Sequence, residues 1–303
     1  MEEIKIYKNI DFTAPIMISG WPGMGNVALG VVEYLHKKLG AVKFAEITVD
    51  PMAILDSVVV DKGMAAFPPV PQNTFYYIKN PEMIIFVGEA QLPGRSGIGL
   101  LNKMLDFAAG LKVKTIFTGA AFPMPVSYKE LPRVYAAVNR KPLGDSVRRC
   151  GVSLMDDGHI SGMNGLLLGF AKQKNIDAVC LLATMPQYAI GLPNPKASGA
   201  VIDVLRKILS FKISFQELGE QIKDVDEKMA AIEEKVGDVL TFEKEEPEHL
   251  PSEKKIPAYI MEKIEKLFQE TRLDKAKAAM LKNELDRWDL YAFYEDRFLD
   301  LFK

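Results

Sequence analysis

Two short strings in the sequence hold the residues that could bind an anion or move a proton. The first, GWPGMGNVALG at residues 20–30, lies between an apolar run at 15–19 and a segment with helical spacing at 26–39. A strand, a glycine turn and a helix in this order place backbone N–H groups and the positive end of the helix dipole where phosphate can bind. Gly23, Gly25 and Asn26 are therefore candidate residues for binding a nucleotide or another anion.

Two known fingerprints nearly fit this glycine turn. Residues 23–28 match the G-x-G-x-x-A form of a dinucleotide turn. The Walker A spacing of glycines also occurs, but Asn26 and Val27 stand where a Lys and a Ser or Thr would hold phosphate and magnesium, which argues against a P-loop nucleotidase. The alternative interpretation is a tight turn that only connects the strand to the helix.

The second string, MDDGHISGMNG at 155–165, lies between a predicted strand and a predicted helix. His159 and Ser161 follow two aspartates there, at the carboxyl end of a strand, where α/β folds usually bind ligands. Nearby carboxylates could make the histidine a usable acid or base. The spacing matches no triad, and Ser161 is equally well explained as a helix N-cap, so we assign no catalytic residue and keep both as possible ligand-binding residues.

The composition excludes several classes of protein. The 303 residues carry a net charge of −2 with no basic stripe, which argues against nucleic acid as a partner. No apolar run approaches the ~18 residues of a membrane span, and the acidic start lacks a secretion signal, so we expect a cytoplasmic protein without membrane contact. Cys150 and Cys180 have no metal-ligand spacing. We expect both in the core, and neither a metal nor a cofactor.

The elements that would position these residues alternate along residues 1–210. Apolar runs rich in Val and Ile are typical of strands covered on both faces, and segments with helical spacing lie between them, which indicates an α/β domain. The proline-rich stretch 50–82 is expected to contain loops and short strands. The apolar runs lie at 15–19, 43–49, 83–89, 115–120, 134–139, 152–156 and 177–184, and the helical segments at 26–39, 97–110, 161–174 and 196–210.

Residues 211–303 differ in charge and period. They carry 39 of the 78 charged side chains but only 2 of the 22 glycines. Apolar residues from Phe215 to Val239 repeat at a 3,4 spacing, which predicts a helix with a narrow, coiled-coil-like seam. A second helical pattern at 260–288 has Thr271 and Asp274 at seam positions, so it should weaken or bend there. We expect a helical hairpin; the alternative is two helices that pack on the domain 1–210 or on another subunit.

Several strings, in a consistent order, resemble the proteasome assembly chaperone family in its prokaryotic-type single-domain form. They cover about residues 1–210 and include GWPGMGNVA, IIFVGEAQLP, ISGMNGLLLGFA and NPKASGAVIDVL. The resemblance implies a three-layer sandwich around a mixed, mostly parallel sheet, similar to nucleoside phosphorylases. It also implies no established catalytic residues and self-association into a homo-oligomer. We therefore expect a non-enzymatic chaperone or adaptor; the alternative is a ligand-binding or enzymatic α/β protein that uses the turn at 20–30.

The last three residues resemble a docking motif of this family. Some members carry a C-terminal hydrophobic–Tyr–any motif that inserts between proteasome α subunits, with the free carboxylate pairing with a lysine. Leu301, Phe302 and Lys303 resemble it, with Phe in place of Tyr. We expect them to dock on proteasome α subunits. The alternative is that the apolar residues of this last amphipathic segment pack locally.

Overall fold

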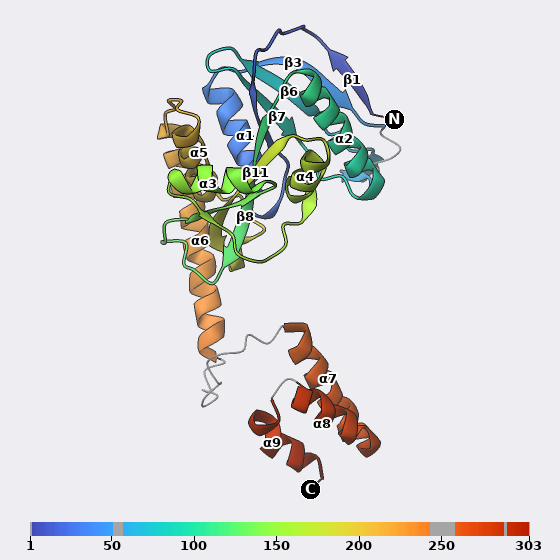
Figure 1. Cartoon of the computed structure of the whole chain (residues 1–303). Coiled ribbons are helices and arrows are strands. Elements are labelled where there is room, and N and C mark those ends of the chain that lie inside the picture. The colour runs from blue at the N-terminus through green and yellow to red at the C-terminus, as the bar shows by residue number, and fades with distance from the viewer. Residues whose placement is uncertain (1, 51–56, 243–257, 288–289, 303) are drawn as a thin grey trace. The chain divides into compact units, whose positions relative to one another are not determined.

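The computed structural model describes residues 2–50, 57–242, 258–287 and 290–302 (Figure 1). It divides into two compact units, Met1–Gly237 and Asp238–Lys303. The sequence predicts a boundary at 210/211 from charge and period. The compact unit extends further because the beginning of the first tail helix packs on the α/β domain.

The first unit is built on a nine-stranded sheet in the order β1-β3-β6-β7-β2-β8-β11-β9-β10. The four strands β7, β2, β8 and β11 are parallel to one another, whereas β1, β3 and β6 join the edge by antiparallel pairing. A separate hairpin pairs β4 with β5. The strands are β1 Glu3–Ile6, β2 Ile16–Gly20, β3 Val42–Thr48, β4 Val59–Asp61, β5 Met64–Ala66, β6 Asn73–Ile78, β7 Met83–Gly88, β8 Thr115–Met124, β9 Val134–Val138, β10 Ser153–Leu154 and β11 Asp177–Pro186.

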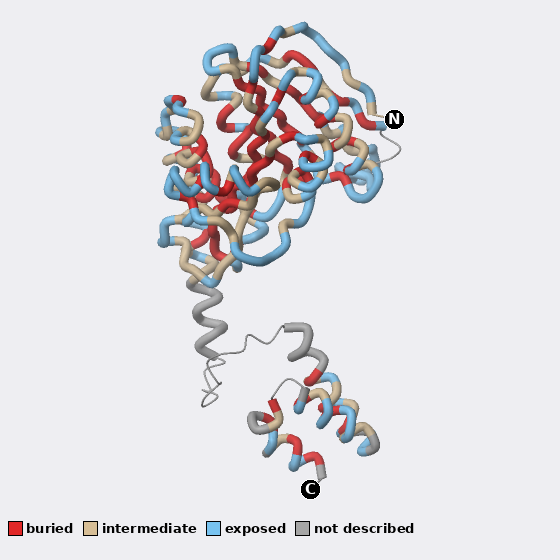
Figure 2. Tube along the Cα trace, in the orientation of Figure 1, coloured by how far each residue is buried: buried red, intermediate tan, exposed pale blue. Residues whose placement is uncertain are grey.

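Helices cover both faces of this sheet, so the expected three-layer α/β sandwich is confirmed. Successive strand residues point to opposite layers: Met17 packs with α2 and α4, and Ile18 packs with α1, α3 and α5. Both faces are therefore apolar, which explains the continuous apolar runs. Figure 2 shows the buried residues concentrated along the strands. These helices are α1 Val27–Lys38, α2 Gly94–Gly110, α3 Lys141–Arg149, α4 Gly162–Gln173 and α5 Pro195–Ile208.

Helix α6 (Gln216–Phe242) uses the first part of its seam against the α/β domain. Leu218 packs into the core beside α1 and α5, and Met229 packs on Met185 and Ala189 near the end of β11. Polar contacts accompany this packing, because Lys38 pairs with Glu217 and the Tyr34 hydroxyl donates to the carbonyl of Ser214 at 2.8 Å. The seam predicted from the 3,4 spacing therefore contacts the α/β domain over these residues.

The second unit has a small apolar core of its own. The predicted pattern at 260–288 forms two helices, α7 (Ala258–Leu273) and α8 (Ala278–Arg287), and α9 (Tyr291–Leu299) follows. The break after α7 falls at Asp274, where the sequence predicts a weak or bent seam. Their core contains Ile264, Phe268, Leu281, Leu285, Leu290, Tyr294, Phe298 and Leu301. The expected helices are present, and their pairing with α6 as a hairpin stays a prediction. No helix in the described ranges is long and apolar enough to cross a membrane.

Candidate functional site

The loops that carry the predicted site residues meet at one edge of the sheet. Because β2, β7, β8 and β11 are parallel, their carboxyl ends lie at the same edge. The glycine turn follows β2, the segment 89–93 follows β7, and residues 155–161 precede α4. The strand order places the turn after β2 at this edge. β10, which precedes the second string, is parallel to β9 and therefore antiparallel to β11. His159 and Ser161 thus reach this edge just before α4, and not at the carboxyl end of a parallel strand as predicted.

A groove of about 880 Å³ lies at this edge. Gly23, His159 and Ser161 all line this groove. The rest of the lining includes residues at the ends of β8 and β11 and at the beginning of α4. Most of the lining is apolar, and among the described residues that form it only His159 has an ionisable side chain. A groove of this size lies within the range of ~300–1,000 Å³ typical of ligand pockets.

Gly25 and Asn26 line a different cavity, of about 350 Å³. Its walls come from α1, from the beginning of α5 and from the first turns of α6. The five residues predicted to bind a ligand are therefore divided between two cavities, three in the groove and two beside α6.

Hydrogen bonds within the protein occupy the backbone of the glycine turn. Gly25 donates its N–H to the carbonyl of Ile190 at 2.9 Å and accepts from the N–H of Asn194 at 2.7 Å. The N–H of Asn26 donates to the carbonyl of Gly23 at 2.9 Å, and the N–H of Gly23 to Asn26 Oδ1 at 3.4 Å. Three N–H groups that a phosphate would use thus already have acceptors, so a ligand at this turn would have to compete with these bonds.

Two buried or bridging amides hold the loops around the groove. Asn164, which is buried, bonds to both backbone groups of Trp21 and accepts from the Thr118 hydroxyl at 3.1 Å. Gln91 donates to the carbonyl of Pro22 at 2.5 Å and accepts from the N–H of Met163 at 2.9 Å. The turn after β2, the loop after β7 and the beginning of α4 are therefore linked by side-chain hydrogen bonds.

His159 and Ser161 are both exposed. Ser161 occupies the N-cap position of α4, as the alternative interpretation predicts, but its hydroxyl makes no capping hydrogen bond. No hydrogen bond joins these two described residues, whereas a nucleophile and its base normally lie within about 2.6–3.2 Å of each other. The pair can offer hydrogen bonds to a molecule in the groove.

The cysteines and carboxylates assemble no further site in the described part of the chain. No group of three His, Cys, Asp or Glu side chains there could hold a metal ion. Cys180 is buried, as expected, and its burial raises the pKa of the thiol to about 12. Cys150 is exposed at the end of α3, so the expectation of a core position was wrong for it.

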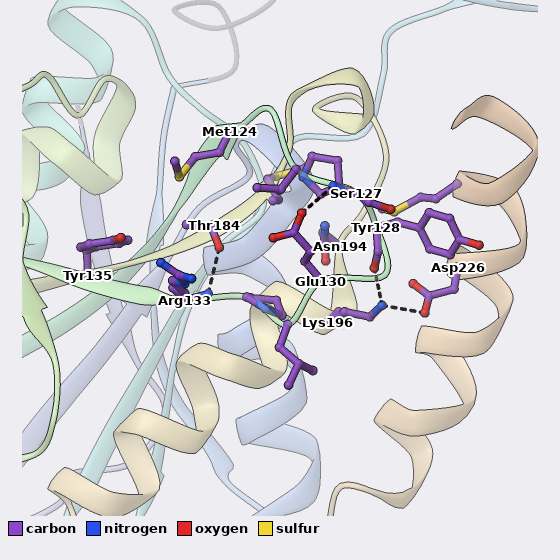
Figure 3. A pocket seen from close by; sticks show the side chains of 16 residues that line it. Met124, Ser127, Tyr128, Glu130, Arg133, Tyr135, Thr184, Asn194, Lys196 and Asp226 are labelled. Atoms are coloured by element: carbon purple, nitrogen blue, oxygen red, sulfur yellow. Dashed lines mark hydrogen bonds and ion pairs between the residues drawn. The ribbon is translucent and has the colours of Figure 1, made fainter. Parts of the chain in front are cut away.

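A smaller cavity of about 170 Å³ marks where α6 attaches to the domain (Figure 3). Lys196 lies between the carbonyl of Tyr128 and the carboxylate of Asp226 on α6, at 2.7 Å from each (Figure 3). Ser127 adds a hydrogen bond to Glu233 at 3.1 Å. Burial and the nearby Glu233 and Asp226 raise the pKa of Tyr188, whose hydroxyl accepts from the N–H of Tyr128. The polar lining of this cavity thus links three segments of the first unit.

The C-terminal residues predicted to dock lie in the second unit. Leu301 is 5% exposed and packs in the core formed by α7, α8 and α9. The backbone of Phe302 belongs to the short helix η5 (Asp300–Phe302), while its side chain and Lys303 lie outside the described residues. Local packing therefore holds for Leu301.

The sequence model of the PAC2 family matches residues 17–233, which is most of the chain. The chain belongs to the PAC2 family. The matched range ends within α6, near the boundary of the first compact unit, so the part of α6 that packs on the α/β domain lies within the region that this PAC2-family chain shares with its relatives.

Three relatives illustrate the similarity. The chain is 29% identical to Pyrococcus furiosus PbaB, an archaeal proteasome activator, with a TM-score of 0.66 over 77% of this chain and 98% of PbaB. Its fold is similar to that of P. furiosus PbaA, an archaeal homolog of proteasome-assembly chaperone, at 20% identity and a TM-score of 0.61, covering 79% and 99% of the two chains. The uncharacterized protein MJ1210 of Methanocaldococcus jannaschii is 27% identical over 232 residues, 73% of this chain and 85% of that protein.

Sequence reasoning missed Gln91 and Asn164, which hold the loops of the groove. Each has a weak signal: Asn164 is a polar residue in the otherwise apolar GMNGLLLG, and Gln91 lies three residues after the buried strand β7. Asn194 stands directly before Pro195 in the sequence, an order typical of a helix N-cap followed by Pro at the first helical position. The structure confirms the cap, since Asn194 Oδ1 accepts from the N–H of Ala197 at 2.9 Å. Its second role, binding the backbone of Gly25, was not predicted.

Proposed function

We propose that this protein is a non-enzymatic, oligomeric assembly chaperone or adaptor that acts on proteasome α subunits through residues 301–303. The observation that carries the proposal is the similarity to the proteasome activator PbaB over 98% of that chain, combined with membership of the PAC2 family. In this proposal the α/β unit mediates self-association and the charged helices reach the partner.

The burial of Leu301 gives docking a structural requirement. A side chain that packs among Phe298, Tyr294 and Phe268 cannot at the same time insert between two α subunits. Docking in this form requires the last turn to leave the small core, at the cost of the apolar area that Leu301 buries there, about 1.5–3 kcal/mol. The measured affinity for α subunits is then lower than the affinity of the opened form, because only chains whose last turn has left the core can bind.

Removal of residues 301–303 tests the docking. We expect the shortened chain to lose association with proteasome core particles and free α subunits, measured by surface plasmon resonance. Because the deletion also removes a core residue, a second variant with two glycines added after Lys303 keeps Leu301 and displaces any terminal carboxylate; it should also lose binding. Unchanged binding by both variants would refute the docking.

Phe302→Tyr tests the same contact in the opposite direction. It restores the phenol hydroxyl of the related motif, and one further hydrogen bond of about 0.5–1.5 kcal/mol would tighten binding roughly 2- to 12-fold. Phe302→Leu is the matched control, since it keeps an apolar side chain without the hydroxyl. Equal affinity of the two variants would contradict a specific pocket for residue 302.

The alternative, a nucleotide or other anion at the turn 20–30, has less support from the geometry. Gly25 and Asn26 line a cavity separate from His159 and Ser161, and their N–H groups already have acceptors. A thermal-shift screen of nucleotides and nucleosides tests it, because a ligand at 100 times its Kd stabilises by about 2.7 kcal/mol. A reproducible shift would favour the alternative.

A further inference from the structure

The β4–β5 hairpin is an apolar element without a core of its own. Val60, Met64 and the following Phe67 are 62%, 76% and 70% exposed. Asp61 and Lys62, at the turn, are the only charged residues between positions 57 and 70. The hairpin therefore exposes an almost uncharged apolar surface in a chain of which 26% of residues are charged.

The local sequence specifies this hairpin. Val59 pairs with Ala66 and Asp61 with Met64, and the two turn residues Lys62 and Gly63 have φ of 47° and 81°. Positive φ at both central residues defines a type I′ turn, whose backbone twist matches that of the two flanking strands, and glycine is favoured in this turn. A two-stranded sheet is at best marginally stable when both faces contact water. A specified shape with exposed apolar faces points to a partner that covers it.

The groove at the carboxyl edge of the sheet is the complementary surface on the same chain. Its lining is mostly apolar and includes Ala121, Phe122 and Ile160, and His159 is the one ionisable side chain that the described part of the chain contributes to it. Met24 and Leu166, also in the lining, are 44% and 47% exposed. Interface cores are depleted of charged residues, and the hairpin and the groove both have this composition.

We propose that the β4–β5 hairpin of one copy of this chain docks in the groove of a neighbouring copy. Apart from Asp61 and Lys62 at the turn, the hairpin carries no charge that would have to be desolvated. In the single chain the hairpin is exposed, so it does not fill its own groove. Because the hairpin and the groove are different patches, the contact is head-to-tail, and its repetition gives a ring when the rotation closes. The inference rests on the self-association in the proposed function and assigns the surfaces that make it.

Three variants test the assignment by light scattering after size-exclusion chromatography. Met64→Glu places a charge on the hairpin and Leu166→Glu places one on the groove; we expect each to be a monomer at concentrations where the unmodified chain is fully assembled. Leu131→Glu is the matched control, because Leu131 is 85% exposed and belongs to neither surface. It should assemble like the unmodified chain. Circular dichroism melts verify that all three are folded.

Mixing the two defective chains separates this contact from a symmetric one. The Leu166→Glu chain keeps an intact hairpin and the Met64→Glu chain keeps an intact groove, so an equimolar mixture should form a dimer through one contact and no larger assembly. A symmetric hairpin–hairpin or groove–groove contact predicts no such heterodimer, and absence of the dimer would overturn the assignment.

Two further outcomes would overturn the hairpin–groove contact. If Met64→Glu or Leu166→Glu assembles normally, the contact is wrong but self-association stands. If the unmodified chain is a monomer, both the contact and the proposed self-association are wrong. Binding of proteasome α subunits by residues 301–303 is measured separately and does not depend on either result.

Discussion

The side-chain amide of Asn164 pairs with both backbone polar groups of Trp21, a residue 143 positions earlier in the chain. Asn164 Oδ1 accepts from the Trp21 N–H at 3.1 Å, and Asn164 Nδ2 donates to the Trp21 carbonyl at 3.1 Å. Asn164 is 5% exposed and Trp21 is fully buried, so water cannot replace these bonds. This pair fixes the turn after β2 against the beginning of α4, and with it the floor of the groove.

Replacement of this amide should therefore be costly. Asn164→Leu removes the partners of the Trp21 backbone and of the Thr118 hydroxyl, and each buried group left unpaired costs about 1–3 kcal/mol. We expect the free energy of unfolding, measured by urea denaturation, to fall by roughly 2–5 kcal/mol. Asn102→Leu is the control, because the amide of Asn102 donates to the carbonyl of Ile98 one turn earlier in the same helix, α2, and so links no distant segments. Equal effects of the two substitutions would contradict the role of Asn164.

Gly25 and Gly40 form a matched pair for the glycine turn. Both have a φ of +61°, but a Cβ on Gly25 would lie 2.7 Å from Met185 Sδ, whereas a Cβ on Gly40 would meet nothing within 4 Å. Gly40→Ala should cost only the left-handed strain, about 1–2 kcal/mol. Gly25→Ala should cost roughly 1–3 kcal/mol more, because of overpacking. Chemical denaturation of both variants measures the difference; equal costs would mean that the contact with Met185 relaxes freely.

The two cysteines should differ in reactivity. Cys150 is exposed, while burial raises the pKa of Cys180 to about 12, so Cys180 carries almost no thiolate at pH 8. Iodoacetamide should therefore modify one thiol in the native protein and two in urea, as measured by mass spectrometry. The Cys150→Ser chain should resist labelling until it unfolds. Rapid native labelling of that variant would show that the core around Cys180 opens.

The Glu265–Arg297 pair predicts a pH dependence in the second unit. The two terminal guanidinium nitrogens of Arg297, Nη1 and Nη2, donate to the two carboxylate oxygens of Glu265 at 2.6 Å each, and this hydrogen bonding lowers the pKa of Glu265 below its ordinary 4.5. The unfolded chain then binds the proton more readily, so the contribution is present above about pH 4.5 and is lost as pH falls through the folded pKa. Its size is modest, about 0.5–1 kcal/mol, because both side chains are partly exposed.

Hydrogen exchange of the α7 and α9 amides measures this contribution in the full chain. Glu265→Gln should exchange faster than the unmodified chain at pH 7, and the two should converge near pH 3. Arg297→Gln and the double substitution complete a cycle that isolates the pair. A difference that stays constant over this pH range would contradict the assignment.

The spacing of apolar residues predicted much of the fold, because whether a segment forms a strand or a helix depends largely on residues close to it in the chain. Alternate residues such as Met17 and Ile18 face opposite helical layers, so a strand buried on both sides appears as one apolar run. In the stretch 50–82 the short strands β4 and β5 are as expected, but the place of β6 in the main sheet was missed. The prolines of this stretch suggested loops and short strands, yet β6 pairs with β3 and β7 inside the sheet. Its antiparallel position needs no helical crossover, so the alternation of strands and helices could not locate it.

The site was predicted in part. Gly23, His159 and Ser161 line one groove. Gly23 follows the carboxyl end of β2, which the pattern predicts, whereas His159 and Ser161 come after β10, which is antiparallel to β11, and reach the groove just before α4. Gly25 and Asn26 line a different cavity, and the segment after β11, at 187–194, binds the backbone of Gly25 through Ile190 and Asn194. Such a contact depends on which loops meet, and sequence periodicity carries no information on that.

The alternation of strands and helices, the change of period after residue 210, the Asn194 cap and the family could all be predicted from the sequence, because they depend on residues close in the chain or on ordered strings. The folded chain was needed to show which groups accept the N–H bonds of the glycine turn, which surface the first seam residues of α6 contact, and that Leu301 is buried. Each of these depends on contacts between segments far apart in sequence. A buried polar group cannot bond to water, and an apolar face is stabilised by removal from water, so both depend on the segment that folding packs against them.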